Sequence, residues 1–178
     1  MASESFLVGA LSDLIADFNR RRVEYALAGG WAYSALVEPR ATTDIDLLVL
    51  IEQPSRETIL GLLSPVFGTT MVHPAPMQFR GISIWRSVGM RQEQEVVVDL
   101  LLADSAFLRT ALGRRRTVML GTLQVPILTL EDLILLKTLA GRLQDLADLE
   151  KIEARKDELQ IDWDYVAEWK TKLGLGGR

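Results

Sequence analysis

The sequence contains no cysteine and only one histidine, His73. The absence of cysteine excludes disulfide bonds, thiolate catalysis and cysteine-ligated zinc. A single histidine can build neither a histidine-rich metal site nor a proton shuttle between two histidines. Any metal binding or acid–base chemistry must therefore be sought among the carboxylates.

Long apolar runs and a large charge of one sign are also missing. No stretch reaches the ~18 apolar residues that a membrane helix needs, and the first residues lack the basic start and apolar core of a signal peptide. We therefore expect a cytoplasmic protein that does not bind membranes. The net charge is −4, which does not favour a surface that coats nucleic acid. Two arginine runs, 20–22 and 114–116, could contact phosphates, but solvated ends of a helix and a strand explain them as well.

The composition is globular, because 48% of the 178 residues are hydrophobic and 25% are charged, without a disorder signature. We expect one domain, 1–178, with a core over about 20–128 and C-terminal helices over about 129–173. The predicted order is a helix, strands with intervening helices, a hairpin and further helices. This order indicates an α/β (mixed α+β) fold, in which helices flank a small mixed sheet.

Hydrophobic periodicity and capping residues place the individual elements. Helices are predicted over 3–22, 31–37, 56–63, 105–112, 130–140, 142–155 and from 163 onward. Strands are predicted over 23–28, 44–51, 78–88, 96–102, 116–120 and 123–127, with a loop or irregular edge over 68–77 and a frayed tail over 174–177. The helix over 142–155 is expected to turn four residues inward: Leu143, Leu146, Leu149 and Ile152.

The region 25–50 carries the pattern that bears most on function. It indicates a buried strand, a Gly-Gly turn, a short helix, and a second strand that opens with Asp44 and Asp46. Side chains alternate along a strand, so these two carboxylates project from the same face, roughly 6.5 Å apart. The apolar run after them does not alternate, which is typical of a strand covered on both faces.

A third carboxylate, Asp99, lies within the aliphatic segment 96–102. Burying it is costly unless it is paired, hydrogen-bonded or bound to metal. If its strand neighbours that of Asp46, the three carboxylates can converge, as phosphoryl and nucleotidyl transfer with two cations requires. Ligands that offer only oxygen favour Mg²⁺. The alternative for Asp99 is a structural role, capping a neighbouring loop.

Gly29 and Gly30 precede the short helix, where backbone N–H groups and the positive helix end favour a phosphate. A turn without a ligand would explain the two glycines equally well if they stood alone. Arg40, in the loop before Asp44, could neutralise a phosphate or simply end that loop.

These motifs together resemble a known signature. Gly29-Gly30, a short helix, and the segment 42–46 (Thr-Thr-Asp-Ile-Asp) before an apolar strand are similar to the signature of the nucleotidyltransferase superfamily, with Asp99 in the third acidic place. The segment 136–149 resembles the lysine and Arg-x-x-Asp-x-x-Asp-Leu helices of AbiEii-type toxins and related bacterial nucleotidyltransferases. Gly30 departs from the serine that many members carry.

The resemblance implies the nucleotidyltransferase fold and a set of site residues. Two Mg²⁺ ions would bind the three carboxylates, with Asp99 as a metal ligand or general base. The nucleotide's phosphates would contact Gly29, Gly30 and Lys137. The alternative for Lys137 is a buried stem without phosphate contact.

The resemblance also implies an activity, the transfer of a nucleoside monophosphate from an NTP to an acceptor hydroxyl. The acceptor stays open between RNA or tRNA, a protein and a small molecule, and a toxin–antitoxin role with a protein partner is one option. A non-catalytic module that binds a nucleotide or a partner, like an antitoxin subunit, is the alternative. Asp145 and Asp148 are expected only to form ion pairs with Arg142 or Lys151.

Overall fold

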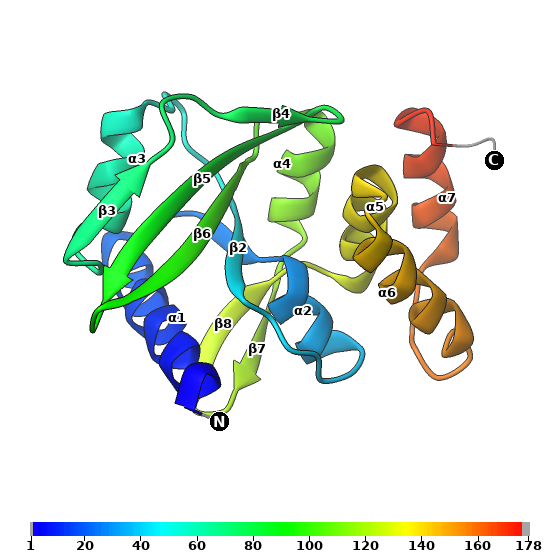
Figure 1. Cartoon of the computed structure of the whole chain (residues 1–178). Coiled ribbons are helices and arrows are strands. Elements are labelled where there is room, and N and C mark those ends of the chain that lie inside the picture. Colours follow the sequence, from blue (N-terminus) through cyan, green and yellow to red (C-terminus); the bar gives the residue numbers. More distant parts are fainter. Residues whose placement is uncertain (1, 176–178) are drawn as a thin grey trace.

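The computed structural model describes residues 2–175 and shows a mixed sheet of eight strands with helices on both faces (Figure 1). The helices are α1 (Ala2–Arg21), α2 (Gly29–Leu36), α3 (Arg56–Leu63), α4 (Ala106–Gly113), α5 (Leu130–Ala140), α6 (Leu143–Ala154) and α7 (Trp163–Lys172). The strands are β1 (Tyr25–Leu27), β2 (Asp44–Val49), β3 (Thr69–Val72), β4 (Met77–Phe79), β5 (Ile82–Arg91), β6 (Gln94–Leu102), β7 (Arg116–Leu120) and β8 (Leu123–Ile127). The predicted mixed α/β class is confirmed.

The order of strands brings distant segments of the chain together. The sheet runs β3-β5-β6-β2-β1-β8-β7, and β4 pairs with β5. The central strands β2 and β6 are parallel, whereas β1 and β5 are antiparallel to their neighbours β2 and β6. Asp46 therefore lies directly opposite Asp99, as the sequence-based hypothesis required.

The sheet is covered on both faces. α1 and α3 lie on one side, and α2 and α4–α7 lie on the other (Figure 1). β2 contributes Ile45, Leu47 and Val49 to the first core and Leu48 to the second. Burial on both faces explains why the apolar run of β2 does not alternate. In the described part of the chain, no helix combines the length and the apolar character needed to cross a membrane.

Two predictions near the sheet edge are wrong. Residues 69–72, expected to be a loop or irregular edge, form the edge strand β3, which pairs with β5. The single strand predicted over 78–88 is instead a hairpin, because β4 ends at Phe79 and the chain turns at Arg80 and Gly81. Both turn residues have positive φ, 47° and 82°. Arginine rarely adopts this conformation, so only Gly81 signalled the turn.

The inward face of α6 also differs from the prediction. Leu143 and Leu146 are 88% and 48% exposed, whereas Asp145 and Asp148 are buried. Residues 145, 148 and 152 share one face of a helix, and only Ile152 of these is apolar. Buried charges therefore take the place of an apolar stripe. Of the predicted tail over 174–177, residues 176 and 177 lie outside the described part.

The turn between α5 and α6 sets up this burial. Thr129 caps α5 by accepting a hydrogen bond from the Asp132 N–H. At its other end, Gly141 adopts φ 60° and its N–H bonds the Lys137 carbonyl. This left-handed cap lets the chain reverse after Ala140. α6 then packs beside α5, with Asp145 and Asp148 facing Lys137.

Candidate functional site

Three carboxylates converge at the centre of the sheet, and we call Asp44, Asp46 and Asp99 the acidic cluster. One oxygen of each lies within 4.8 Å of the other two. Asp44 and Asp46 are partly buried, and Asp99 is buried. Oxygen donors in this arrangement suit a divalent cation such as Mg²⁺. The convergence expected from the sequence is present.

The electrostatics of the acidic cluster favour a bound cation. The pKa of Asp46 is raised to about 7, chiefly by burial and then by the charges of Asp44 and Asp99, against the lowering effect of Arg142 and Lys137. Positive charge added beside Asp46 would favour its ionised form. The residues present therefore fit a divalent metal.

The glycine pair lets the backbone approach these carboxylates. Gly29 has φ +56°, and a Cβ there would stand 1.8 Å from the Asp46 carboxylate. A Cβ on Gly30 would stand 2.7 Å from the Arg40 guanidinium and 2.9 Å from the Thr42 hydroxyl. The N-terminus of α2 consequently lies beside the acidic cluster, and no side chain caps it. Backbone N–H groups at such an end can receive an anion.

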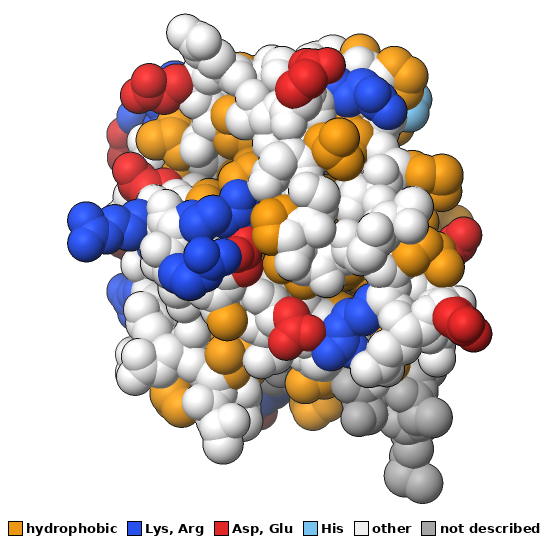
Figure 2. Space-filling model, turned by 90° about the vertical axis from the view of Figure 1, so that its left-hand side faces the viewer, with side chains coloured by type: hydrophobic (Ala, Val, Ile, Leu, Met, Phe, Trp, Pro, Cys, Tyr) orange, Lys and Arg blue, Asp and Glu red, His pale blue; other side chains and the backbone are white. Residues whose placement is uncertain are grey.

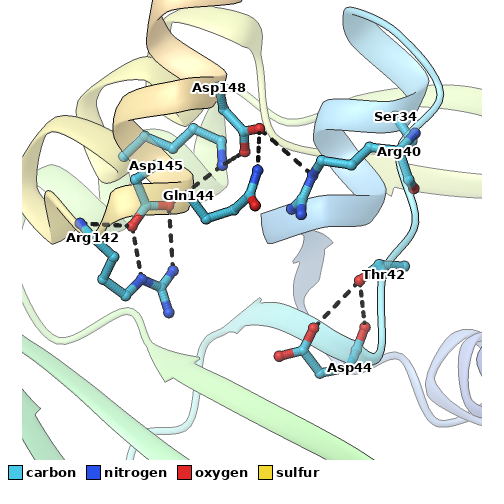
Figure 3. Close-up of polar contacts among 9 residues, drawn as sticks. Ser34, Arg40, Thr42, Asp44, Arg142, Gln144, Asp145 and Asp148 are labelled. Atoms are coloured by element: carbon cyan, nitrogen blue, oxygen red, sulfur yellow. Dashed lines mark hydrogen bonds and ion pairs between the residues drawn. The ribbon is translucent and has the colours of Figure 1, made fainter.

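The loop before β2 fixes Asp44. The Thr42 hydroxyl is 3.2 Å from the Asp44 carbonyl and 3.3 Å from its carboxylate (Figure 3). The Trp31 indole N–H also donates to the Asp44 carbonyl, at 3.0 Å. Neither Thr42 nor Trp31 was assigned this role from the sequence, in which Thr42 stands only as part of the motif 42–46.

Arg86 on β5 is a site residue that the sequence analysis missed. Its Nε and Nη2 donate to the two oxygens of Asp99 at 2.9 and 2.6 Å. Arg86 shares a strand face with Ile82 and Ile84. A charged residue at position 86, on the same face as two isoleucines, was the available signal. It was missed because polar and apolar residues alternate imperfectly in the segment 78–88.

Lys137 is buried in what we call the charge network. Its ammonium lies 2.6 Å from Asp148 and 3.5 Å from Asp145. Arg142 also pairs with Asp145, at 2.7 Å, as expected (Figure 3). The network is completed by Arg40 and Gln144, which contact Asp148 at 3.6 and 3.0 Å.

α6 also holds the loop that leads to Asp44. Lys151 pairs with Glu38 at 2.5 Å, not with Asp145 or Asp148. The Arg155 guanidinium, just after the helix, donates to the Val37 carbonyl. Together with the contact from Arg40 to the network, these interactions tie α6 to residues 37–40.

One cavity joins the acidic cluster to the charge network. Its polar wall comprises Gly29, Asp46, Asp99, Lys137, Arg142 and Asp145. Its apolar wall comprises Phe79, Ile82, Ile84, Leu101, Leu133, Leu136 and the alanines 28 and 140. A cavity with convergent charges and an apolar wall is suited to a ligand that carries both a charged part and a flat apolar part.

The arginine runs have structural partners. Arg20 and Arg21 pair with Asp17 in α1, and Arg114 pairs with Glu131 at 3.3 Å. Figure 2 views the molecule from the side of α3 and β3, where lysine and arginine side chains are mixed with acidic and hydrophobic ones. A continuous basic surface is not seen on that face.

Comparison with known proteins identifies the fold. No protein-family model matches the sequence, and no curated protein matches it significantly. A nucleotidyltransferase-like protein from Paracoccidioides brasiliensis matches with TM-score 0.57 and 21% identity, over 82% of this chain and 74% of that one. A nucleotidyltransferase-related structure from Thermotoga maritima matches with TM-score 0.55 and 13% identity, over 83% and 92%.

A third similar structure is ANT(2")-Ia in complex with adenylyl-2"-tobramycin. It has TM-score 0.58 and 16% identity, and the match covers 93% of this chain and 95% of that one. At these identities the similarity concerns the fold, which is that of nucleotidyltransferase-like proteins.

Proposed function

We propose that the chain is a metal-dependent nucleotidyltransferase that moves a nucleoside monophosphate from an NTP to an acceptor hydroxyl. The observation that carries the proposal is the acidic cluster beside the Gly29-Gly30 turn. Oxygen ligands for cations and backbone donors for phosphates thus meet at one cavity. The fold shared with nucleotidyltransferase-like proteins supports the same activity.

Asp44, Asp46 and Asp99 would hold Mg²⁺, with two ions as the expected number. When bound, the metal neutralises phosphate charge and stabilises the charge that develops during transfer. Arg86 occupies one lone pair on each oxygen of Asp99. A carboxylate oxygen has a second lone pair, so Asp99 can still bind a metal or accept the proton of the acceptor hydroxyl.

The chain's own groups would bind the triphosphate. Gly29 and Gly30 would present backbone N–H groups to the phosphates. The Lys137 ammonium has three N–H donors, and its two carboxylate partners leave one for a phosphate at the cavity wall. Arg142, held by Asp145, adds a second cation at the same wall. This fixed arrangement would orient the nucleotide before transfer.

We propose a small molecule as the acceptor, in preference to RNA or a protein. Nearly the full length of this chain matches ANT(2")-Ia, whose ligand carries an adenylyl group on tobramycin. A toxin–antitoxin role, which would require a protein partner, has no such support.

The test is incubation of the purified protein with each α-labelled NTP, Mg²⁺, and separate pools of small hydroxyl compounds, RNA and protein. Label should enter the small-molecule fraction, and pyrophosphate should appear. Asp44→Asn should abolish both signals. The matched control is Asp13→Asn, because Asp13 is an exposed carboxylate on α1 that pairs with Arg91.

Transfer into RNA or protein would correct the acceptor class. Mg²⁺-dependent NTP binding without transfer to any pool would favour the non-catalytic alternative. Equal transfer by wild type and Asp44→Asn would overturn the assignment of the acidic cluster.

A further inference from the structure

Arg86 stands in line with two members of the acidic cluster. On neighbouring strands, Arg86 lies opposite Asp99, and Asp99 lies opposite Asp46. Residues opposite one another point to the same face of the sheet. The guanidinium then closes a two-pronged contact with both oxygens of Asp99, at 2.9 and 2.6 Å.

Arg86 differs from the other cations around the cavity. Among the described residues, it alone forms a salt bridge with the acidic cluster. Lys137 and Arg142 instead pair with carboxylates of the charge network. Arg86 pairs with no carboxylate other than Asp99 within the described chain, and its side chain is 49% exposed. Its charge therefore acts chiefly on the acidic cluster.

We propose that Arg86 is a resident counter-ion that weakens metal binding to the empty site, so that the metal binds well only together with the nucleotide. This inference rests on the proposed function, because it presumes a metal at Asp44, Asp46 and Asp99. A guanidinium on Asp99 repels a divalent cation at close range, although a second lone pair on each oxygen stays free for the metal. The negative charge of a triphosphate offsets this repulsion.

A second effect of Arg86 acts in the opposite direction. By holding Asp99 in one orientation, the guanidinium also pre-arranges a metal ligand. That benefit is limited to the rotamers of one short side chain, and Asp99 is also buried. The repulsion acts between one charge and a double charge in a partly buried site, so we expect it to be the larger effect.

The experiment measures Mn²⁺ binding by electron paramagnetic resonance on the full-length protein without nucleotide. Arg86→Met should bind Mn²⁺ about tenfold more tightly than wild type. Arg86→Lys keeps the charge and loses the two-pronged geometry, so it should remain close to wild type. The matched control is Arg91→Met, which removes an arginine of the same strand that pairs with Asp13 instead.

The same titrations are repeated with α,β-methylene-ATP, which cannot be cleaved at the reacting bond. The advantage of Arg86→Met should shrink to about twofold, because the triphosphate compensates the guanidinium in wild type. Thermal unfolding of each variant verifies that it is folded.

Weaker or unchanged Mn²⁺ binding by Arg86→Met would overturn the inference and leave Arg86 as a residue that only orients Asp99. An equal gain in Arg86→Lys would overturn it as well, because geometry would then account for the effect. The proposed function fails separately, if wild type binds no Mn²⁺ even with the nucleotide analogue.

Discussion

The two groups of buried charge that border the cavity are balanced in opposite ways. The acidic cluster has three carboxylates and one contacting cation, Arg86. The charge network has two carboxylates and three contacting cations: Lys137, Arg142 and Arg40. The acidic cluster thus carries an uncompensated negative charge, whereas the network carries a positive surplus.

The difference separates a site that needs a ligand from one that supports the structure. Buried charges are tolerated when they are paired, and the network meets that condition with the chain's own groups. In the acidic cluster, among the described residues, only Asp99 has such a partner, Arg86. A metal at the acidic cluster would neutralise its negative charge, and a phosphate at the charge network would neutralise its positive surplus. A metal-bound NTP carries both groups.

The largest expected effect comes from removing charge from the acidic cluster. Asp46→Asn should lower nucleotidyl transfer about 1,000-fold, equivalent to about 4 kcal/mol of transition-state stabilisation. Its stability without metal should be unchanged or higher, because a repulsive charge is gone. Initial rates and urea unfolding measure the two quantities. Low stability in this variant would contradict the view that the cluster is functional rather than structural.

Breaking the charge network should instead lower the stability of the folded protein. Asp148→Ala leaves Lys137 buried without its closest partner, so we expect a loss of about 3–5 kcal/mol in unfolding free energy. Urea unfolding without metal measures it. The double variant Lys137→Met, Asp148→Leu removes both charges and should recover most of the loss. If it is as unstable as the single variant, lost packing and not an unpaired charge is the cause.

A smaller effect is expected where the backbone meets the acidic cluster. Gly29→Ala introduces a side chain at φ +56° and 1.8 Å from the Asp46 carboxylate. We expect a loss of about 1–3 kcal/mol in stability and weaker metal binding, measured by unfolding and Mn²⁺ titration. Gly61→Ala in α3, where a Cβ meets nothing within 4 Å, serves as the control and should be neutral or stabilising.

A further expected effect is the pH dependence of the metal-free protein. The pKa of Asp46 rises from 3.8 to about 7 on folding, so the folded state holds a proton that the unfolded chain releases. This contribution to stability is full below the unfolded pKa and is lost as pH rises through the folded pKa. Thermal unfolding temperature should therefore fall as pH rises from the unfolded pKa of 3.8 to the folded pKa of about 7, and level off above it.

Two comparisons isolate the Asp46 contribution. Asp46→Asn should show a flatter pH dependence over the same range, because it has no carboxyl to titrate. Saturating Mn²⁺ should restore the stability of wild type at pH 8. An Asp46→Asn curve that parallels wild type would assign the pH dependence to another group.

The acidic cluster was predictable from the sequence because its clues are local. Asp44 and Asp46 show their shared face by spacing alone, and Asp99 is conspicuous within an aliphatic strand. Their convergence followed once β2 and β6 were taken as neighbours. The mixed sheet followed from the same buried strands.

The contact between Arg86 and Asp99 and the buried face of α6 were not predictable. The first depends on how β5 and β6 pair, which the sequence does not show. Arg86 meets Asp99 only because β5 and β6 turn at Gln92 and Glu93, both with positive φ and neither a glycine. The charged segment 91–95 does indicate a turn between the two strands, but it does not show which two residues form it, and that choice sets the register. The inner face of α6 was misread for a related reason, because Asp145 is buried by partners on other elements.

The contacts of α6 with residues 37–40 let the C-terminal part of the chain help to position the loop before β2. Lys151 and Arg155 hold Glu38 and Val37, and the chain then leads directly into Asp44. These contacts link the C-terminal part of the chain to the loop before β2, which carries Asp44 and Asp46. A chain cut before Lys151 would keep both aspartates in its sequence but would lose the contacts of Lys151 and Arg155 with Glu38 and Val37.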